Sequence, residues 1–202
     1  MMKPTEAQRR RHIIDSTIAV LVRDGVEGTS LSRVAGEAGV AKGIICYYFS
    51  SKDGLYDAVL ASVRERMVNA VLADAEALDD PWQRICTFVT AHLRYVRRHR
   101  AGLLALRHLA ATRAGGSEVS DHLAVWREQK AWLAATLTEG QESGAFRSFD
   151  TVVVATAISG ALESGLLQWA HNPALDLDRY ARQLLDLFEP GICEALDERR
   201  FA

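Results

Sequence analysis

A short segment near the N-terminus contains two helical patterns joined by a glycine turn, and it constrains the fold more than any other part of the chain. The segment spans positions 29–55 and reads TSLSRVAGEAGVAKGIICYYFSSKDGL. Ser30 is a suitable N-cap for the first helix, because its hydroxyl can accept a hydrogen bond from a free amide of the opening turn. Gly39 can adopt the left-handed conformation that ends this helix. A second helix is expected from about Ala41 to Tyr48, and the pair predicts a helix-turn-helix. The inward positions of the first helix are expected to be Leu31, Val34, Ala35 and Ala38.

The second helix of the pair has the residues of an element that reads DNA. Ala41 and Gly43 are small, so the backbone of the first turn can approach DNA closely and its free amides can meet a phosphate oxygen. Lys42 adds a positive charge at that contact. Tyr47 and Tyr48 follow at the far end, where hydroxyls can bond phosphates and rings can touch a sugar or a thymine methyl.

Charge is distributed unevenly along the chain. Residues 1–52 contain eight Lys or Arg and five Asp or Glu, a net charge of +3, and the remainder carries −5. The basic side chains include an arginine triplet at 9–11, ahead of an amphipathic stretch that is expected to stop at Gly25, and Lys52, which is placed for one more phosphate contact. The sequence pI of about 6.3 argues against a generally basic surface, so contact with nucleic acid has to be local.

Each of these features also has an ordinary structural explanation. Helix-turn-helix geometry occurs as plain packing, an arginine triplet is common at a solvated terminus, and neighbouring tyrosines often fill a core or a surface. Periodicity by itself leaves these alternatives open. Ile45 and Phe49 of the second helix are expected to anchor it to the core.

In residue identity this segment resembles the signature of the tetracycline-repressor (TetR) family of bacterial regulators, over about a quarter of the chain. The residues that carry the resemblance are Thr29, Ser30, Leu31, Val34, Ala35, Ala38, Gly39, Val40, Lys42, Gly43, Tyr47, Tyr48, Phe49, Ser51, Lys52 and Leu55. It implies an all-α protein with a three-helix helix-turn-helix DNA-binding domain at 1–52 and a helical ligand-binding and dimerisation domain at 53–202.

The resemblance also implies which positions contact DNA. They are Ser32 and Arg33 of the supporting helix, and Ala41, Lys42, Gly43, Ile44, Tyr47, Tyr48 and Lys52. Two positions depart from the family pattern. Cys46 stands where many members have a tyrosine, so one hydroxyl contact is missing. Ile44 offers methyl groups and no hydrogen-bond donor, which favours reading of thymine methyls and groove shape.

The function implied by the resemblance is a ligand-responsive repressor. A homodimer would bind an inverted-repeat operator in double-stranded DNA, and a small-molecule effector would release it. The GII-x-YYF and KDGL segments also resemble the subgroup of choline-responsive repressors of betaine synthesis. Alternatives are a DNA-binding adaptor without a ligand and an all-α enzyme. The sequence has no zinc pattern, nucleophile elbow, phosphate loop or dinucleotide fingerprint, so no enzyme activity, cofactor or metal site is expected.

The rest of the chain reads as helical, with Gly, Pro and Asn breaks. Helices are expected near 52–78, 81–98, 101–112, 118–143, 149–171 and 177–197, which makes about nine with the first three. The last two are expected to pair with the same helices of a second chain, although burial of that face within one chain remains open. A mobile loop at 114–117 would suit a pocket entrance.

A ligand site in this second domain needs apolar walls and a few polar groups. The candidates are Phe88, His92, Tyr95, Leu103, Leu106, Arg107, Trp126, Trp132, Glu163, Leu167 and Trp169. Glu163 is the sharpest of these, because a carboxylate in an otherwise apolar helix needs a partner or a cation. With Trp126, Trp132 or Trp169 facing it, a cage for a quaternary amine would result.

The cysteines and the hydrophobic segments indicate a cytoplasmic protein without a membrane partner. Cys46, Cys86 and Cys193 are odd in number and widely spaced, which fits neither a disulfide framework nor a paired metal motif. The N-terminus is polar and does not read as a signal peptide. The apolar stretch 151–170 contains Glu163 and several small residues, so a buried helix is expected there instead of a membrane span.

Overall fold

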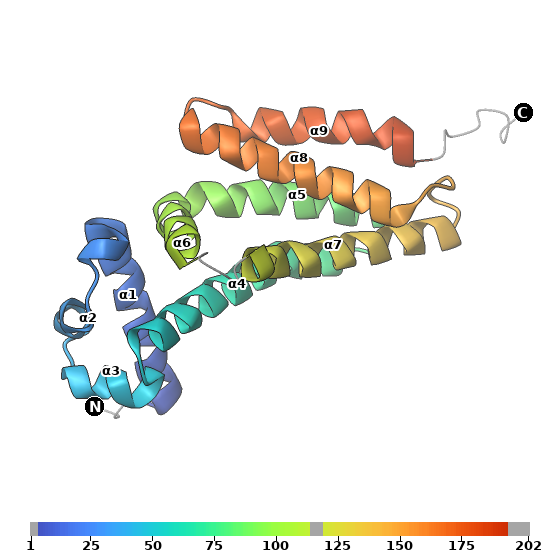
Figure 1. Ribbon diagram of the computed structural model, residues 1–202. Coiled ribbons are helices and arrows are strands. Elements are labelled where there is room, and N and C mark those ends of the chain that lie inside the picture. The colour runs from blue at the N-terminus through green and yellow to red at the C-terminus, as the bar shows by residue number, and fades with distance from the viewer. Residues whose placement is uncertain (1–3, 114–118, 194–202) are drawn as a thin grey trace, which may run out of the picture. The chain divides into compact units, whose positions relative to one another are not determined.

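The computed structural model describes residues 4–113 and 119–193, and over these residues the chain is helical (Figure 1). The helices are α1 Glu6–Gly28, α2 Leu31–Ala38, α3 Lys42–Phe49, α4 Lys52–Glu76, α5 Pro81–Arg98, α6 Arg100–Arg113, α7 Val119–Glu142, α8 Thr151–His171 and α9 Leu177–Ile192. The prediction of an all-α fold with about nine helices is confirmed. The loop predicted at 114–117 lies outside the described residues.

The helices group into two compact units, which are described separately. The first unit comprises Met1–Arg66 and His99–Ser120, and so contains α1 to α3, the start of α4, and α6. The second comprises Met67–Arg98 and Asp121–Ala202. The end of the DNA-binding domain at residue 52 remains a prediction. As a packing unit, the N-terminal part of the chain extends further along α4 and takes in α6.

Helix α1 begins earlier and ends later than the sequence suggested. Thr5 and Gln8 form a capping box, because each side chain bonds the other's backbone amide. The arginines at 9–11 therefore lie inside the helix, and the expectation that they precede it is wrong. Gly25 breaks the helical path with φ of 71°, but helix resumes and continues to Gly28.

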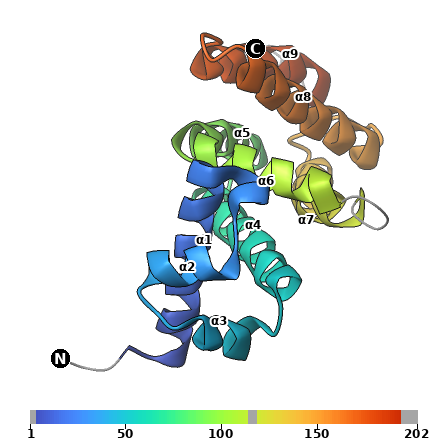
Figure 2. The same cartoon turned by 60° about the vertical axis from the view of Figure 1, so that its left-hand side comes forward.

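The turn between α2 and α3 is built as its sequence predicts. The Ser30 hydroxyl accepts a hydrogen bond from the amide of Arg33, over 3.2 Å. Gly39 adopts the left-handed conformation, with φ of 63° and ψ of 33°. The Val40 amide then donates to the carbonyl of Ala35 over 3.0 Å, which closes the end of α2. Figure 2 shows α2 and α3 following one another around this turn.

The junction between α3 and α4 depends on one glycine. A Cβ atom at Gly54 would lie 2.3 Å from the carbonyl oxygen of Phe49, so only glycine fits there. Ser50, between the two helices, has a positive φ of 61°, which is unusual for a residue with a side chain. The tight junction seats the start of α4 on the same core as α3. The largest fully buried side chains of this core are Ile13, Leu21, Ile45, Leu55 and Leu109.

In the second unit, α8 and α9 pack side by side (Figures 1 and 2). A Cβ atom at Gly165 would lie 2.5 Å from the ring of Tyr180, so the small residue permits the close approach. The Tyr180 hydroxyl donates to the carbonyl of Ala161 over 2.6 Å. Asp150 and Asp176 cap the two helices through backbone amides.

Helix α8 is long and apolar enough to span a membrane by length and composition. One of its faces is buried in the second unit, through residues that include Ala155, Ile158 and Leu162. Val152 and Val153 on another face are 59% and 62% exposed. The expectation of a buried helix therefore holds for one face and not for the other.

Candidate nucleic-acid interface

Helix α3 divides its side chains between the core and the surface. Ile45 and Phe49, one turn apart, are buried, as the sequence predicts. Lys42 and Gly43 are exposed, and the Tyr47 side chain is 77% exposed. An exposed tyrosine on a helix that is anchored along its other face is available to a partner molecule.

The N-terminus of α3 is open. Its N-cap residue, Ala41, makes no side-chain hydrogen bond to the first turn. A Cβ atom at Gly43 would meet nothing within 4 Å, and the backbone there needs no positive φ. Neither packing nor conformation therefore requires a glycine at this position. Free amides beside Lys42 form the kind of helix end that binds a phosphate.

The other predicted contact residues of this segment are held by neighbouring side chains: Ile44, Tyr48 and Lys52. Ile44 and Tyr48 are partly buried against the core of the first unit. The Tyr48 ring meets the Tyr47 ring edge-on, with centroids 5.2 Å apart. Lys52 is exposed, and its Nζ lies 5.3 Å from the centroid of the Tyr56 ring. These contacts order the side chains that were predicted to touch DNA.

A charged network joins α1 to α2, and sequence reasoning did not find it. Arg33 donates to Asp24 over 3.0 Å, and Arg23 bonds both Asp24 and Glu37. Ser32 and Arg33 are exposed, as expected of DNA-contacting positions. Hydrogen bonds from Arg23 lower the pKa of Asp24, and Arg33 adds to the effect. The charges that pair between the two helices lie 9 and 14 positions apart, so the sequence pattern did not indicate that they would meet.

Near the start of α1, the guanidinium carbon of Arg10 lies 4.7 Å from the centroid of the Phe49 ring. This cation–π contact fixes the first turns of α1 beside the end of α3. Arg10 and Arg11 remain exposed.

The candidate ligand residues are dispersed. In the second unit Phe88, His92 and Trp169 are buried, while Tyr95, Trp132, Glu163 and Leu167 are partly buried. Leu103 belongs to the first unit and is partly buried. The side chains of Leu106, Arg107 and Trp126 lie outside the described part of the structure.

The structure brings together three of these candidates, from α5 and α7. The Phe88 and Trp132 rings stack with centroids 5.2 Å apart, and the His92 ring lies 6.0 Å from Phe88. Complete burial lowers the pKa of His92 to about 4, so its imidazole is neutral at pH 7. Gln129, one turn before Trp132 on α7, is also fully buried. It was not among the candidates, although its helical spacing from Trp132 and Leu133 was a usable signal.

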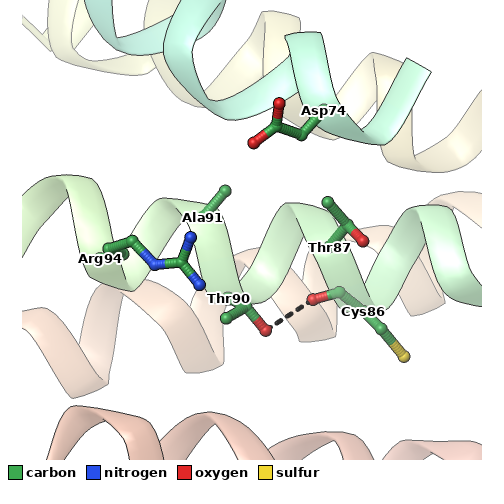
Figure 3. Close-up of a pocket in the computed structure, with 6 residues that line it drawn as sticks. All are labelled: Asp74, Cys86, Thr87, Thr90, Ala91 and Arg94. Carbon is green, nitrogen blue, oxygen red and sulfur yellow. Dashed lines mark hydrogen bonds between the residues drawn. The ribbon is translucent and has the colours of Figure 1, made fainter. Parts of the chain in front are cut away.

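Two surface pockets of the second unit are lined by residues outside this cluster. One, of about 200 Å³, is lined by Asp74 of α4 and by Cys86, Thr87, Thr90, Ala91 and Arg94 of α5 (Figure 3). Burial raises the pKa of the Cys86 thiol to about 11, so it is a poor nucleophile. The other, of about 440 Å³, lies at the end of α8 and includes Leu167. Among the candidate ligand residues whose side chains the structure describes, Leu167 alone lines one of these two pockets.

The short helix α3 has an open N-terminus, is exposed on one face and is held across a supporting helix by a glycine turn. This is the geometry of a helix-turn-helix, the motif whose second helix can enter the major groove of DNA. Residues 13–59 match the family model described as bacterial regulatory proteins of the tetR family. This N-terminal segment is therefore similar to the DNA-binding part of TetR-family regulators.

Curated relatives match the same end of the chain. The HTH-type transcriptional regulator BetI of Klebsiella pneumoniae is 36% identical over 72 residues, which cover 36% of this chain and 37% of the relative. BetI 2 of Chromohalobacter salexigens is 37% identical over 75 residues, covering 37% and 36%. The aligned part thus spans little more than a third of each relative. These relatives are named as regulators, in agreement with the expectation that the chain is not an enzyme.

Solved structures match nearly the whole chain in fold. A TetR transcription regulator from Haloarcula marismortui has a TM-score of 0.81 at 20% identity and covers 93% of this chain and 100% of that one. A putative transcriptional regulator from Saccharomonospora viridis, solved in complex with choline, has a TM-score of 0.78 at 20% identity, covering 94% and 100%. At these identities the likeness establishes the fold.

Proposed function

We propose that the protein is a ligand-responsive transcriptional repressor that binds an inverted-repeat operator as a homodimer. The observation that carries the proposal is the α3 surface. Its first-turn amides have no side-chain cap, Gly43 faces open space, and Lys42 and Tyr47 are exposed beside them. A phosphate can approach this backbone closely while exposed side chains reach base edges.

Dimerisation gives this short helix its useful affinity. One recognition helix reads only a few base pairs, whereas two held about 34 Å apart meet successive turns of the major groove. The exposed face of α8 supports pairing through α8 and α9. Alongside its exposed valines it carries small exposed residues that would let another helix approach: Thr156, Ala157 and Gly160. Leu187 of α9 is 74% exposed.

The second unit would hold the effector. The BetI relatives are named as regulators, and the choline complex is known for a protein of the same fold. A coupling of about 1–3 kcal/mol between effector and DNA sites is sufficient to release an operator. A cytoplasmic location follows from this function, since the operator lies in the chromosome.

Selection of bound duplexes from a random pool tests the proposal. We expect enrichment of an inverted repeat whose half-sites are about one helical turn apart. A double variant, Lys42→Ala with Tyr47→Ala, should lose the enrichment, whereas the charge-matched control Lys130→Ala on α7 should keep it. A pool that shows no enrichment with the wild-type protein, or enrichment that survives the double variant, contradicts the proposal.

A further inference from the structure

The side chain of Gln129 is an anomaly in the interior of the second unit. It is fully buried, and in the described part of the chain neither its amide nitrogen nor its amide oxygen has a hydrogen-bond partner. A carboxamide removed from water without partners destabilises the folded state. Such groups in a native protein call for an explanation, and a bound molecule is one of the few available.

Two further polar atoms with the same property lie nearby in the fold. The indole Nε1 of Trp132 is buried and unpartnered among the described residues, and so is Nε of Arg84. Trp132 lies three residues after Gln129 and therefore on the same face of α7. The Arg84 guanidinium carbon is 5.5 Å from the centroid of the Trp132 ring. The unpartnered atoms thus gather where α5 meets α7.

The pairing of α5 and α7 places His92 at the level of Gln129. Arg84 pairs with Glu139, and Phe88 stacks on Trp132, so the two helices run antiparallel. One turn beyond Phe88 on α5 is His92, and one turn before Trp132 on α7 is Gln129. Both side chains are fully buried. The neutral imidazole of His92 adds no charge to this layer.

The charges at this contact are balanced. Arg84, the cation that the described residues place beside Trp132, is ion-paired with Glu139. A charged ligand buried here would lack a counter-ion and would lose its hydration. The ring of Trp132 already has two partners, Phe88 and the Arg84 guanidinium. An organic cation would therefore find a second cation beside the ring and not a free aromatic face.

The hydrogen-bonding groups on offer define a complementary molecule. Gln129 supplies a donor and an acceptor side by side, while Trp132 and Arg84 supply donors only. A carbonyl oxygen can accept from these donors, and an adjacent N–H can donate to the Gln129 oxygen. We propose that the contact between α5 and α7 around Gln129 and Trp132 binds a small uncharged amide or lactam. This inference deepens the proposed function, because such a molecule would be the effector.

Binding of defined probes to the full-length protein tests the inference. The probes are benzamide and 2-pyrrolidinone, with choline as the charged comparison and toluene as the apolar one. We expect saturable quenching of tryptophan fluorescence by at least one amide probe, with affinity reduced tenfold or more in Gln129→Leu. The control Gln83→Leu, an exposed glutamine of α5, should bind the probe as the wild type does.

A second readout separates a ligand-binding role from a structural one. Without probe, Gln129→Leu should raise the midpoint of thermal unfolding, because it replaces an unpartnered amide by an apolar group of similar size. If that variant fails to fold, Trp132→Phe removes the indole N–H, keeps a ring for Phe88, and should weaken amide binding about fivefold. A lowered midpoint in folded Gln129→Leu, or amide binding unaffected by either variant, overturns the inference.

The same preparations distinguish this inference from the proposed function. Operator binding by the wild type without probe tests the function alone. Suppose that the wild type binds its operator. Absence of saturable amide binding would then overturn the inference, and so would choline binding that depends on Gln129. In both cases the proposed function as a DNA-binding regulator would stand. Loss of operator binding by the wild type overturns the proposed function itself.

Discussion

The Arg33 guanidinium of α2 donates a hydrogen bond to the Asp24 carboxylate of α1 over 3.0 Å. A side chain that the family resemblance assigns to DNA contact is thus already paired within the first unit. Asp24 also places a negative charge close to the surface that would approach phosphates. The pair links α2 to α1, and under the proposed function we expect it to weaken the attraction of α2 for DNA.

Asp24→Asn should therefore tighten DNA binding. Removing the negative charge of this partly buried carboxylate is expected to raise affinity about two- to fivefold at low salt. Titration of a labelled operator at two salt concentrations checks this. Arg33→Ala should cost more affinity in the Asp24→Asn background than in the wild type. Equal losses in both would show that Asp24 does not restrain Arg33.

Gly43→Ala should separate DNA binding from folding. The added methyl group meets nothing within the protein, and alanine favours a helix by up to about 1 kcal/mol, so the free energy of unfolding should stay equal or rise. Operator affinity should fall about tenfold or more, because the methyl group holds the backbone away from the phosphate. Urea unfolding and operator titration of the same preparation provide the measurement and its control. Unchanged operator affinity would mean that DNA does not contact the first turn of α3.

Gly54→Ala should lower the stability of the fold, in contrast to Gly43→Ala. Its Cβ would lie 2.3 Å from the Phe49 carbonyl oxygen, and relieving that clash requires the junction of α3 and α4 to shift. We expect a loss of about 2 kcal/mol or more in the free energy of unfolding, measured by urea denaturation. Gly43→Ala, a glycine in open space, is the matched control. A variant as stable as the wild type would refute the tight junction.

Lys52→Ala should reduce binding to all DNA sequences alike. Each lost phosphate contact lowers the slope of log affinity against log salt concentration by about 0.9. Lys52 is exposed at the start of α4, so its removal should leave stability nearly unchanged. Titrations across a salt series on two unrelated duplexes check the prediction, and a wild-type slope in the variant would exclude a phosphate contact.

Burial of His92 should make the fold sensitive to mild acid. The pKa of this imidazole falls from 6.5 to about 4 on folding, so between these values the unfolded chain binds a proton that the folded chain does not. Protonation thus favours unfolding, and stability should decrease as the pH drops through this window. The expected loss between pH 7.5 and pH 5 is about 2 kcal/mol.

Urea unfolding at the two pH values measures this loss. His92→Leu should remove that component of the pH dependence, while the exposed His108→Leu should retain it. The same pH dependence in all three proteins would mean that His92 binds its proton equally in both states.

Much of the fold was predictable because its signals are local. Ser30 and Gly39 cap α2 through contacts within one or two turns, and Asp80 caps α5 in the same way, with its carboxylate bonded to the Gln83 amide over 2.7 Å. For the same reason the boundaries of α5 to α8 lie within about two residues of those expected, whereas the end expected for the last helix, at 197, lies outside the described residues. At Gly25 local reading failed, since the residue breaks the helix without ending it.

The sequence by itself determined the helix-turn-helix and the order of the helices, because caps, turns and periodicity act between residues close together in the chain. Only the tertiary structure decided which partners meet across helices. The pairing of Asp24 with Arg33, the seat of Tyr180 on Gly165 and the isolation of the Gln129 amide each depend on segments distant in sequence. Hydrophobic periodicity shows that a face is buried but does not identify the residue that covers it.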